Sequence, residues 1–282
     1  MQSVRFIGRG RAGGALALAL SGLGWEVRRP LGRGDDPADA AAGVDLLVIA
    51  TPDDAVAEVA AAVRPVEGTV VLHLAGSLGT GVLAPHRRRA ALHPLVPLPD
   101  PSSGARRLTG GVTFAVAGDR LAATIAGQLG GRVVEVADAD RPAYHAAACI
   151  AANHVVALLG QAERVAASAG LGIDAFLDLA RAAVDDVARL GPAAALTGPA
   201  SRGDWTTLAR HRDALDPSER SGYHAGVALA RRLAEQGTAG GGRGSGGRVA
   251  GRPEPDPGVA GAGARADDAV PSAPVVVPVG AR

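Results

Sequence analysis

The sequence contains no lysine, so all 29 of its basic residues are arginine. This absence excludes a Schiff-base lysine and a lysine general acid from any mechanism of the chain. The single cysteine excludes an internal disulfide and is typical of a reducing compartment. A formal net charge of +1 gives no basis for electrostatic binding of nucleic acid or of a membrane surface.

Long apolar runs are also missing. The chain has no uninterrupted apolar stretch of about 18 residues, and its N-terminus turns glycine-rich after one short apolar run, unlike a signal peptide. We therefore expect a cytoplasmic protein without a membrane span. We also expect no metal site. The length of 282 residues is sufficient for two domains with a sizeable core.

The first half of the sequence alternates short apolar runs with helical patterns. The predicted strands are "SVRFIG", "WEVRR", "VDLLVIATP", "GTVVLHLAG", "RAALHPLVPL", "GVTFAVAG" and "RVVEVA". Such alternation predicts an α/β domain over residues 1–136, with a parallel sheet covered on both faces. Residues 137–236 contain only helical patterns, which predicts an all-helical second domain. Residues 237–282 are rich in Gly, Pro, Ala and Arg without periodicity, and we expect a disordered tail.

A glycine motif follows the first predicted strand and opens a helix. It has the pattern GxGxxG, and the residues predicted to bind a dinucleotide are Gly8, Gly10, Arg11, Ala12 and Gly13. In this context the glycines allow a tight turn, the approach of the backbone to a pyrophosphate, and packing of the helix on the sheet. The alternative is a glycine-rich turn in a chain that has 40 glycines.

Arginines stand where NAD-binding proteins usually place an acidic residue. Arg28 and Arg29 end the second strand and Arg33 follows in the loop. Arg28 and Arg33 are predicted to bind a 2′-phosphate, which favours NADP(H) over NAD. A solvated arginine cluster is the alternative. Thr51 and Pro52, after the third strand, are predicted to shape the floor near the nicotinamide ribose. A helix cap by Asp53 is an equal and compatible interpretation of this motif.

Three polar residues lie at or near predicted strand ends that open on the same crevice. His73 and Ser77 belong to "VLHLAGSLG", and His93 belongs to "ALHPLVPLP". An imidazole beside a carbonyl can polarise it or deliver a proton. A histidine satisfied in the core is an equally good interpretation of either histidine.

The apolar helical pattern from Tyr144 to Glu163 holds the only cysteine and the only asparagine of the chain. His145, Cys149 and Asn153 recur every four residues and so share one face of the helix. Because a buried unpaired amide or imidazole is costly, this face should meet a polar partner or a ligand. Structural packing is the alternative, and it is the better interpretation for Cys149.

The segment "ALTGPASRGDW" joins two helical patterns. Its Arg202 could hold a substrate carboxylate in bidentate fashion. An Arg202–Asp204 bridge within the loop is an equal alternative.

Six motifs occur in an order that resembles bacterial proteins with a Rossmann-like domain followed by a DUF2520 domain. They are "GRAGGAL", "TPDD", "HLAGSLG", "LHPLVPLPD", "YHAAACIAAN" and "LTGPASRGDW", and the resemblance covers about residues 3–235. The family looks like a branch of the 6-phosphogluconate dehydrogenase-like superfamily, near ketopantoate reductases and pyrroline-5-carboxylate reductases. The resemblance implies NADPH between the two domains, a helical domain that closes over substrate, and a homodimer.

The resemblance also implies a substrate, a small 2-oxo acid such as 2-dehydropantoate (ketopantoate). Ketopantoate reductases use a lysine on the first helix of the second domain, and this chain has none. We expect His145 to replace it as proton donor, with His93 as the second choice and Asn153 orienting the substrate. Arg202 would hold the carboxylate, with His73 and Ser77 nearby. The alternatives are a reductase of an imine or another oxo acid, and a non-catalytic NADP(H) sensor.

Overall fold

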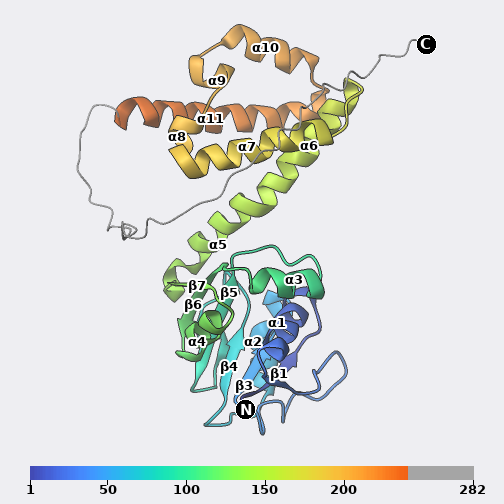
Figure 1. Ribbon diagram of the computed structural model, residues 1–282, viewed down its shortest axis with the longest axis vertical. Helices are drawn as coiled ribbons and strands as arrows, with labels where there is room; N and C mark the ends of the chain where they lie inside the picture. Colours follow the sequence, from blue (N-terminus) through green and yellow to red (C-terminus); the bar gives the residue numbers. More distant parts are fainter. Residues whose placement is uncertain (241–282) are drawn as a thin grey trace, which may run out of the picture.

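The structure is a computed structural model that describes residues 1–240, with side-chain environments up to residue 237. Its first part is a seven-stranded sheet in the order β2-β1-β3-β4-β5-β6-β7 (Figure 1). The strands are β1 (Ser3–Ile7), β2 (Glu26–Val27), β3 (Leu46–Ile49), β4 (Val70–His73), β5 (Arg89–Pro94), β6 (Thr113–Gly118) and β7 (Arg132–Glu135). The predicted α/β fold with a sheet domain followed by a helical part is confirmed.

One strand pair departs from the predicted parallel sheet. β5 and β6 run antiparallel, whereas every other neighbouring pair is parallel. The helix between them, α3 (Pro101–Leu108), packs against α1 (Arg11–Gly22) rather than crossing over β5 and β6, so the chain returns alongside β5. The helix forms because Asp100 accepts a hydrogen bond from the Ser103 N–H and Pro101 occupies the first turn.

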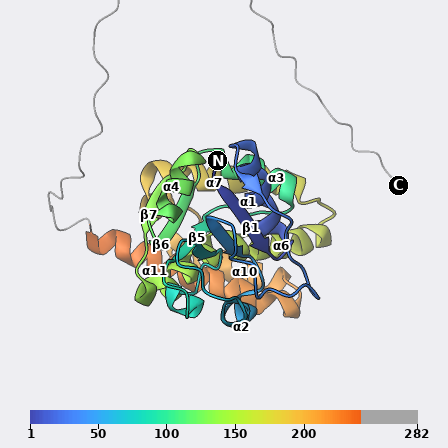
Figure 2. The same cartoon turned by 90° about the horizontal axis from the view of Figure 1, so that it is seen from below.

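Helices cover both faces of the sheet. One core cluster joins inward-facing strand residues such as Phe6, Leu72 and Phe114 to α1, α3 and α4 (Leu121–Gln128). A second cluster joins Ile7, Ile49 and other strand residues to α2 (Val56–Ala62). Figure 2 shows α1, α3 and α4 on one side of the strands and α2 on the other. The near-continuous burial of β3 and β4 is typical of strands covered on both faces.

The helical part begins with one long rod. It consists of α5 (Arg141–Cys149), a π-helical segment (Ile150–His154) and α6 (Val155–Ser168), and it leads away from the sheet (Figure 1). At its far end lie α7 (Asp174–Leu190), α8 (Pro192–Ala195), α9 (Pro199–Arg202), α10 (Trp205–Ala214) and α11 (Arg220–Gly240). The stretch predicted to be helical contains the long helices α6, α7 and α11. Helix α8 ends where the segment "ALTGPASRGDW" begins, α9 lies within this segment, and α10 begins at its last residue. The predicted disorder falls on the tail, most of which lies outside the described residues.

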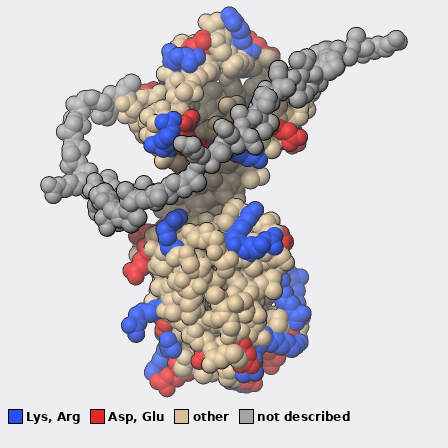
Figure 3. Space-filling model, in the orientation of Figure 1, with Lys and Arg blue, Asp and Glu red and all other residues tan. Residues whose placement is uncertain are grey.

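Many apolar side chains of the helical part are exposed. Val156, Leu179, Val184 and Leu229 are each at least 61% exposed in this chain. The helical stretch Asp138–Ser168 is long and apolar enough to cross a membrane by length and composition alone, with a mean hydropathy of 1.3. Such a helix is weak evidence for a membrane span, because a helix that packs on another chain has the same features. On the face that Figure 3 shows, charges of both signs are scattered, without a patch of one sign.

Candidate functional site

Two cavities lie along the edge where the parallel strands end. The larger, of about 940 Å³, lies at the ends of β1 and β3. The smaller, of about 390 Å³, lies between the end of β5 and the α5 rod. Three strand steps separate β1 from β5, or about 14 Å at the usual spacing between strands. An extended dinucleotide in the first cavity would therefore reach toward the second.

The larger cavity has the backbone geometry that a dinucleotide requires. Gly8 has φ +104°, and a Cβ there would lie 2.4 Å from the Ala50 carbonyl oxygen, so only glycine fits. Gly10 caps α1 without a side-chain hydrogen bond, and no atom lies within 4 Å of the Cβ it lacks. Gly13 is buried against Ala50. The helix N-terminus is therefore open to an anion beside this cavity.

The side chains of this cavity fit the same ligand. Gly8, Gly10, Arg33, Thr51 and Pro52 line it, as do Arg9 and Asp35. The Thr51 hydroxyl is buried without a hydrogen-bond partner among the described residues, so it is free for a ribose hydroxyl. Asp35 is held by Arg29 and by the Gly32 N–H, and these contacts lower the pKa of its carboxyl.

The remaining predicted cofactor residues lie at the margin of this cavity or away from it. Arg11 is the exposed first residue of α1. Ala12 borders a small apolar gap with Leu16 and Phe114 beneath the helix. Arg28 forms an ion pair with Glu26, 2.8 Å long, and is not among the residues that line the cavity. Of the two arginines predicted to bind a 2′-phosphate, only Arg33 therefore lines the cavity.

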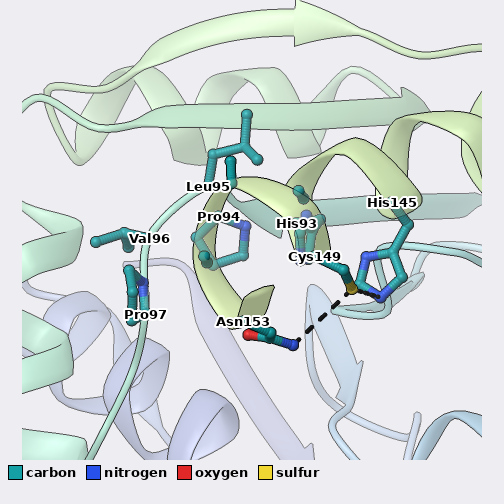
Figure 4. Close-up of a pocket in the computed structure, with 11 residues that line it drawn as sticks. His93, Pro94, Leu95, Val96, Pro97, His145, Cys149 and Asn153 are labelled. Atoms are coloured by element: carbon teal, nitrogen blue, oxygen red, sulfur yellow. Dashed lines mark hydrogen bonds between the residues drawn. The ribbon is translucent and has the colours of Figure 1, made fainter. Parts of the chain in front are cut away.

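The smaller cavity brings together the three residues predicted to be catalytic. His93 comes from the end of β5, and His145, Cys149 and Asn153 come from one face of the α5 rod (Figure 4). The rest of the lining is apolar, from Pro94–Pro97 and alanines of the rod. Among the described residues, no arginine, aspartate or glutamate lines this cavity. An imidazole pair over an apolar floor can donate a proton but offers no cation to a carboxylate.

His93 has one nitrogen bonded and one open. Its Nδ1 lies 2.7 Å from the Tyr144 hydroxyl, and its Nε2 has no hydrogen bond with any described residue. Burial, and after it the neighbouring His145, lowers the pKa of His93 to about 4. The ring is therefore neutral near pH 7, with one N–H to donate.

This lowered pKa makes the stability of the fold depend on pH. An unfolded histidine titrates near pH 6.5, so between this value and about 4 the unfolded chain binds more protons at this position than the folded one. The contribution of His93 to the free energy of unfolding is therefore complete above about pH 6.5. It is lost as the pH falls toward the pKa of the folded state, about 4. Between pH 7 and pH 5, we expect the free energy of unfolding to fall by about 1–2 kcal/mol more in the wild type than in His93→Gln. Urea unfolding of both proteins at both pH values measures this difference. An equal change in the free energy of unfolding in the two proteins would contradict the lowered pKa of His93.

His145 contacts both His93 and the cysteine. Its ring meets the His93 ring edge-on, with centroids 5.5 Å apart. Its Nε2 lies 3.6 Å from the Cys149 sulfur, toward which Asn153 Nδ2 also donates at 3.9 Å. Its Nδ1 is buried without a partner among the described residues. The predicted polar face of the helix is therefore a series of contacts from Asn153 through Cys149 to His145, whose ring meets His93.

Gly76 fixes the distance between the two histidines. A Cβ on this residue would lie 2.3 Å from His145 Nδ1 and 2.9 Å from His93 Nε2. The two nitrogens therefore converge on the same point over the Gly76 backbone. A side chain at this position would force the two rings apart.

The three predicted substrate residues lie outside the smaller cavity. His73 is fully buried in the sheet, with Nε2 3.3 Å from the Gly79 carbonyl oxygen. This placement corresponds to the alternative interpretation of His73 as a histidine satisfied in the core. The Ser77 hydroxyl donates to Asp53 at 3.2 Å. Arg202 ends α9, away from the sheet (Figure 1), and is not among the residues that line either cavity.

The sequence patterns missed two residues beside the histidine pair. Tyr144 bonds to His93, and Arg141, one helical turn earlier, is fully buried. Arg141 donates to the Ala75 carbonyl oxygen at 3.5 Å, and Asp138 lies 3.9 Å from its Nε. A fully buried arginine is rare unless it is paired, yet its Nε and Nη2 have no hydrogen-bond partner among the described residues. The signal for Tyr144 was its place next to His145 on the same helix.

The fold is a Rossmann-type sheet domain followed by a helical part, with a cavity that fits a dinucleotide and a histidine pair at one sheet edge. The family model for the Rossmann-like domain matches residues 28–99, and that for the domain of unknown function DUF2520 matches residues 111–230. Both domains that the motifs indicated are thus matched, in the predicted order. A search of curated proteins finds no match.

Several solved structures share this fold. Protein TM1727 from Thermotoga maritima is 22% identical, with a TM-score of 0.63 over 83% of this chain and 98% of its own. BF3122 from Bacteroides fragilis, named as a candidate NADP oxidoreductase, is 22% identical, with a TM-score of 0.68 over the same shares. A reductive aminase from Aspergillus terreus, in complex with NADPH and ethyl levulinate, is 18% identical, with a TM-score of 0.58 over 84% of this chain and 95% of its own. At these identities the likeness concerns the fold.

Proposed function

We propose that this chain is an NADP(H)-dependent reductase that reduces a C=O or C=N bond of a small molecule. The observation that carries the proposal is the alignment of two cavities along one sheet edge. One cavity fits a dinucleotide, and the other holds the neutral imidazole of His93 beside the His145 ring. The names of the Bacteroides and Aspergillus relatives, an NADP oxidoreductase and a reductive aminase, support the same reaction class.

The residues that would hold the cofactor are Gly8, Gly10, Gly13, Arg33, Thr51 and Pro52. Arg11 and Ala12 lie next to them at the start of α1, whereas Arg28 lies outside the cavity in its ion pair with Glu26. NADPH, when bound, supplies the hydride. The apolar lining of the smaller cavity would surround the reacting atoms. His93 donates the proton, because its Nε2 is open while His145 Nδ1 is buried and His145 Nε2 faces Cys149. The geometry thus shifts the proposed donor from His145 to His93, with His145 and Asn153 completing the wall beside it.

The cofactor preference gives a test with a matched control. Arg33 lines the cavity, whereas Arg28 is paired with Glu26 outside it. Because a charge-assisted hydrogen bond contributes about 1.5–3 kcal/mol, Arg33→Ser should weaken NADPH binding by about tenfold or more and leave NADH binding unchanged. Arg28→Ser should change neither. Fluorescence titration of both cofactors measures this, and equal effects on NADPH and NADH would refute the 2′-phosphate contact.

Ketopantoate is the first substrate to test, on the strength of the family resemblance. Its carboxylate needs a cation, and we propose that Arg202 supplies it when a second copy packs on the helical part. A cyclic or acyclic imine is the second candidate, favoured by the cavity lining, which lacks a charged side chain among the described residues. Purified protein is assayed for NADPH oxidation with ketopantoate, other 2-oxo acids, neutral ketones and cyclic imines. Binding of NADPH without oxidation by any of them would support a sensor.

We also propose a homodimer in the cytoplasm, formed through the helical part. Large apolar side chains of α6, α7 and α11 are exposed in this chain, and a second copy would cover them. Sedimentation equilibrium should give a dimer for the wild type. Leu179→Arg on α7, 69% exposed, should shift the protein toward monomer, whereas Leu18→Arg on α1, 50% exposed, should not. A wild-type monomer at high concentration would contradict the proposal.

A further inference from the structure

The Tyr144–His93 contact determines which nitrogen of His93 carries the proton. The two groups form a 2.7 Å hydrogen bond between the Tyr144 hydroxyl and His93 Nδ1. Either group could be the donor, because a neutral imidazole has one N–H and one acceptor nitrogen. If the hydroxyl donates, the imidazole proton resides on Nε2, which has no hydrogen bond with any described residue. If Nδ1 donates, the hydroxyl hydrogen has no acceptor among the described residues.

When the Tyr144 hydroxyl donates to His93 Nδ1, both polar hydrogens of the pair can have an acceptor. The hydroxyl hydrogen is bonded to Nδ1, and the Nε2 hydrogen can bond to a carbonyl or imine that enters the cavity. Burial raises the pKa of Tyr144, so its hydroxyl keeps its proton in the resting protein. Burial also keeps His93 neutral near pH 7. Both groups are therefore neutral, and the phenol O–H is the more acidic donor of the two. The hydrogen-bond inventory thus favours the hydroxyl as the donor to His93 Nδ1.

Arg141 places a positive charge on the same side of α5. It lies three residues before Tyr144, a spacing that puts two side chains on one helix face. It is fully buried, and its Nε and Nη2 have no hydrogen-bond partner among the described residues, while Asp138 lies 3.9 Å from Nε as an ion-pair partner. Its charge acts on Tyr144 in the direction that favours the phenolate. A buried guanidinium with spare donors is suited to stabilise negative charge that develops on the tyrosine.

We propose that Tyr144 is a positioning and proton-relay residue for the reductase, a proposal that rests on the function above. Its hydroxyl fixes His93 as the Nε2–H tautomer. When a hydride adds to the substrate, the His93 Nε2–H bond breaks and an O–H or N–H bond forms on the product. The Tyr144 O–H bond then breaks and an Nδ1–H bond forms, so the imidazole stays neutral. The phenolate, next to Arg141, regains its proton from water.

Tyr144→Phe tests the relay, because it removes only the hydroxyl. We expect kcat to fall by about tenfold or more, within the range of a lost proton-transfer group, with the Kd of NADPH unchanged. Tyr223→Phe is the matched control. Tyr223 forms a bond of the same length, 2.7 Å, with His211 Nδ1 in the helical part. That variant should keep the wild-type kcat.

Imidazole ¹⁵N chemical shifts supply the readout that a merely structural role would not move, with His93→Gln identifying the signals. We expect the Nε2–H tautomer of His93 in the wild type and a mixture of tautomers in Tyr144→Phe. An Nδ1–H tautomer in the wild type, or an unchanged tautomer and kcat in Tyr144→Phe, would overturn the proposal. If the wild type oxidises no NADPH with any substrate, the proposed function fails, and the proton relay fails with it. The tautomer signals test the positioning role of Tyr144 independently of turnover, so a failure of the function can be distinguished from a failure of the inferred hydrogen bond.

Discussion

His93→Gln is expected to lower kcat by about 10²- to 10⁴-fold, the usual contribution of a general acid. Glutamine retains a side-chain amide that can hydrogen-bond to a substrate, but it cannot give up a proton. His93 lines the cavity with an open Nε2, and its neutral ring is set by burial and by His145. The Kd of NADPH should stay within about twofold, since the dinucleotide cavity lies at the ends of β1 and β3.

His86→Gln is the matched control for this substitution. His86 is also buried, with its Nε2 2.9 Å from the Ala60 carbonyl oxygen, but it lies in the core outside both cavities. We expect lower stability and an unchanged kcat in His86→Gln. Steady-state NADPH oxidation and cofactor titration on both variants separate the effects. An equal loss of kcat in the two variants would indicate a general effect of losing a buried histidine.

Gly76→Ala is expected to reduce turnover by about a hundredfold or more, because a misplacement of catalytic groups by about 1 Å can have this effect. The added methyl group would lie 2.3 Å from His145 Nδ1 and 2.9 Å from His93 Nε2, so the rings must separate. The residue does not line the dinucleotide cavity, so NADPH binding should persist.

The control for Gly76→Ala is Gly81→Ala, a few residues further along the same loop region. No atom lies within 4 Å of the Cβ that Gly81 lacks, so its methyl group meets open space. We expect wild-type turnover in Gly81→Ala. Single-turnover measurements with saturating NADPH report the chemical step for both variants. Wild-type turnover in Gly76→Ala would show that the spacing of the histidine pair is not needed for the reaction.

The cofactor half of the site could be predicted from the sequence because its signals are local. Gly8, Gly10 and Gly13 lie within six residues of each other, directly after a strand. A side chain at Gly8 or Gly13 would clash with Ala50, and Gly10 leaves the helix N-terminus open. The shared face of His145, Cys149 and Asn153 also followed from helical periodicity alone. Both features stay within one or two elements, so no tertiary contact had to be known.

The rest depends on contacts between residues that are distant in the sequence. The hydrogen bond between Tyr144 and His93 joins residues that are 51 positions apart. Without knowledge of this bond, a tyrosine at the start of a helix would be interpreted as a packing residue. The alternation of strands and helices cannot tell that α3 packs on α1 and lets β6 return antiparallel to β5. His73 lies at a strand end like His93, yet only the three-dimensional structure shows that it faces the core.

The measurement that tests the central claim most directly uses NADPH carrying deuterium on the transferable position of its nicotinamide ring. The protein is incubated with this cofactor and each member of the substrate panel, and the products are analysed by mass spectrometry and NMR. The account predicts one deuterium on the carbon of the former C=O or C=N bond, and its near-absence with His93→Gln in the same time. Tight NADPH binding with no deuterium in any product would contradict a reductase at this sheet edge.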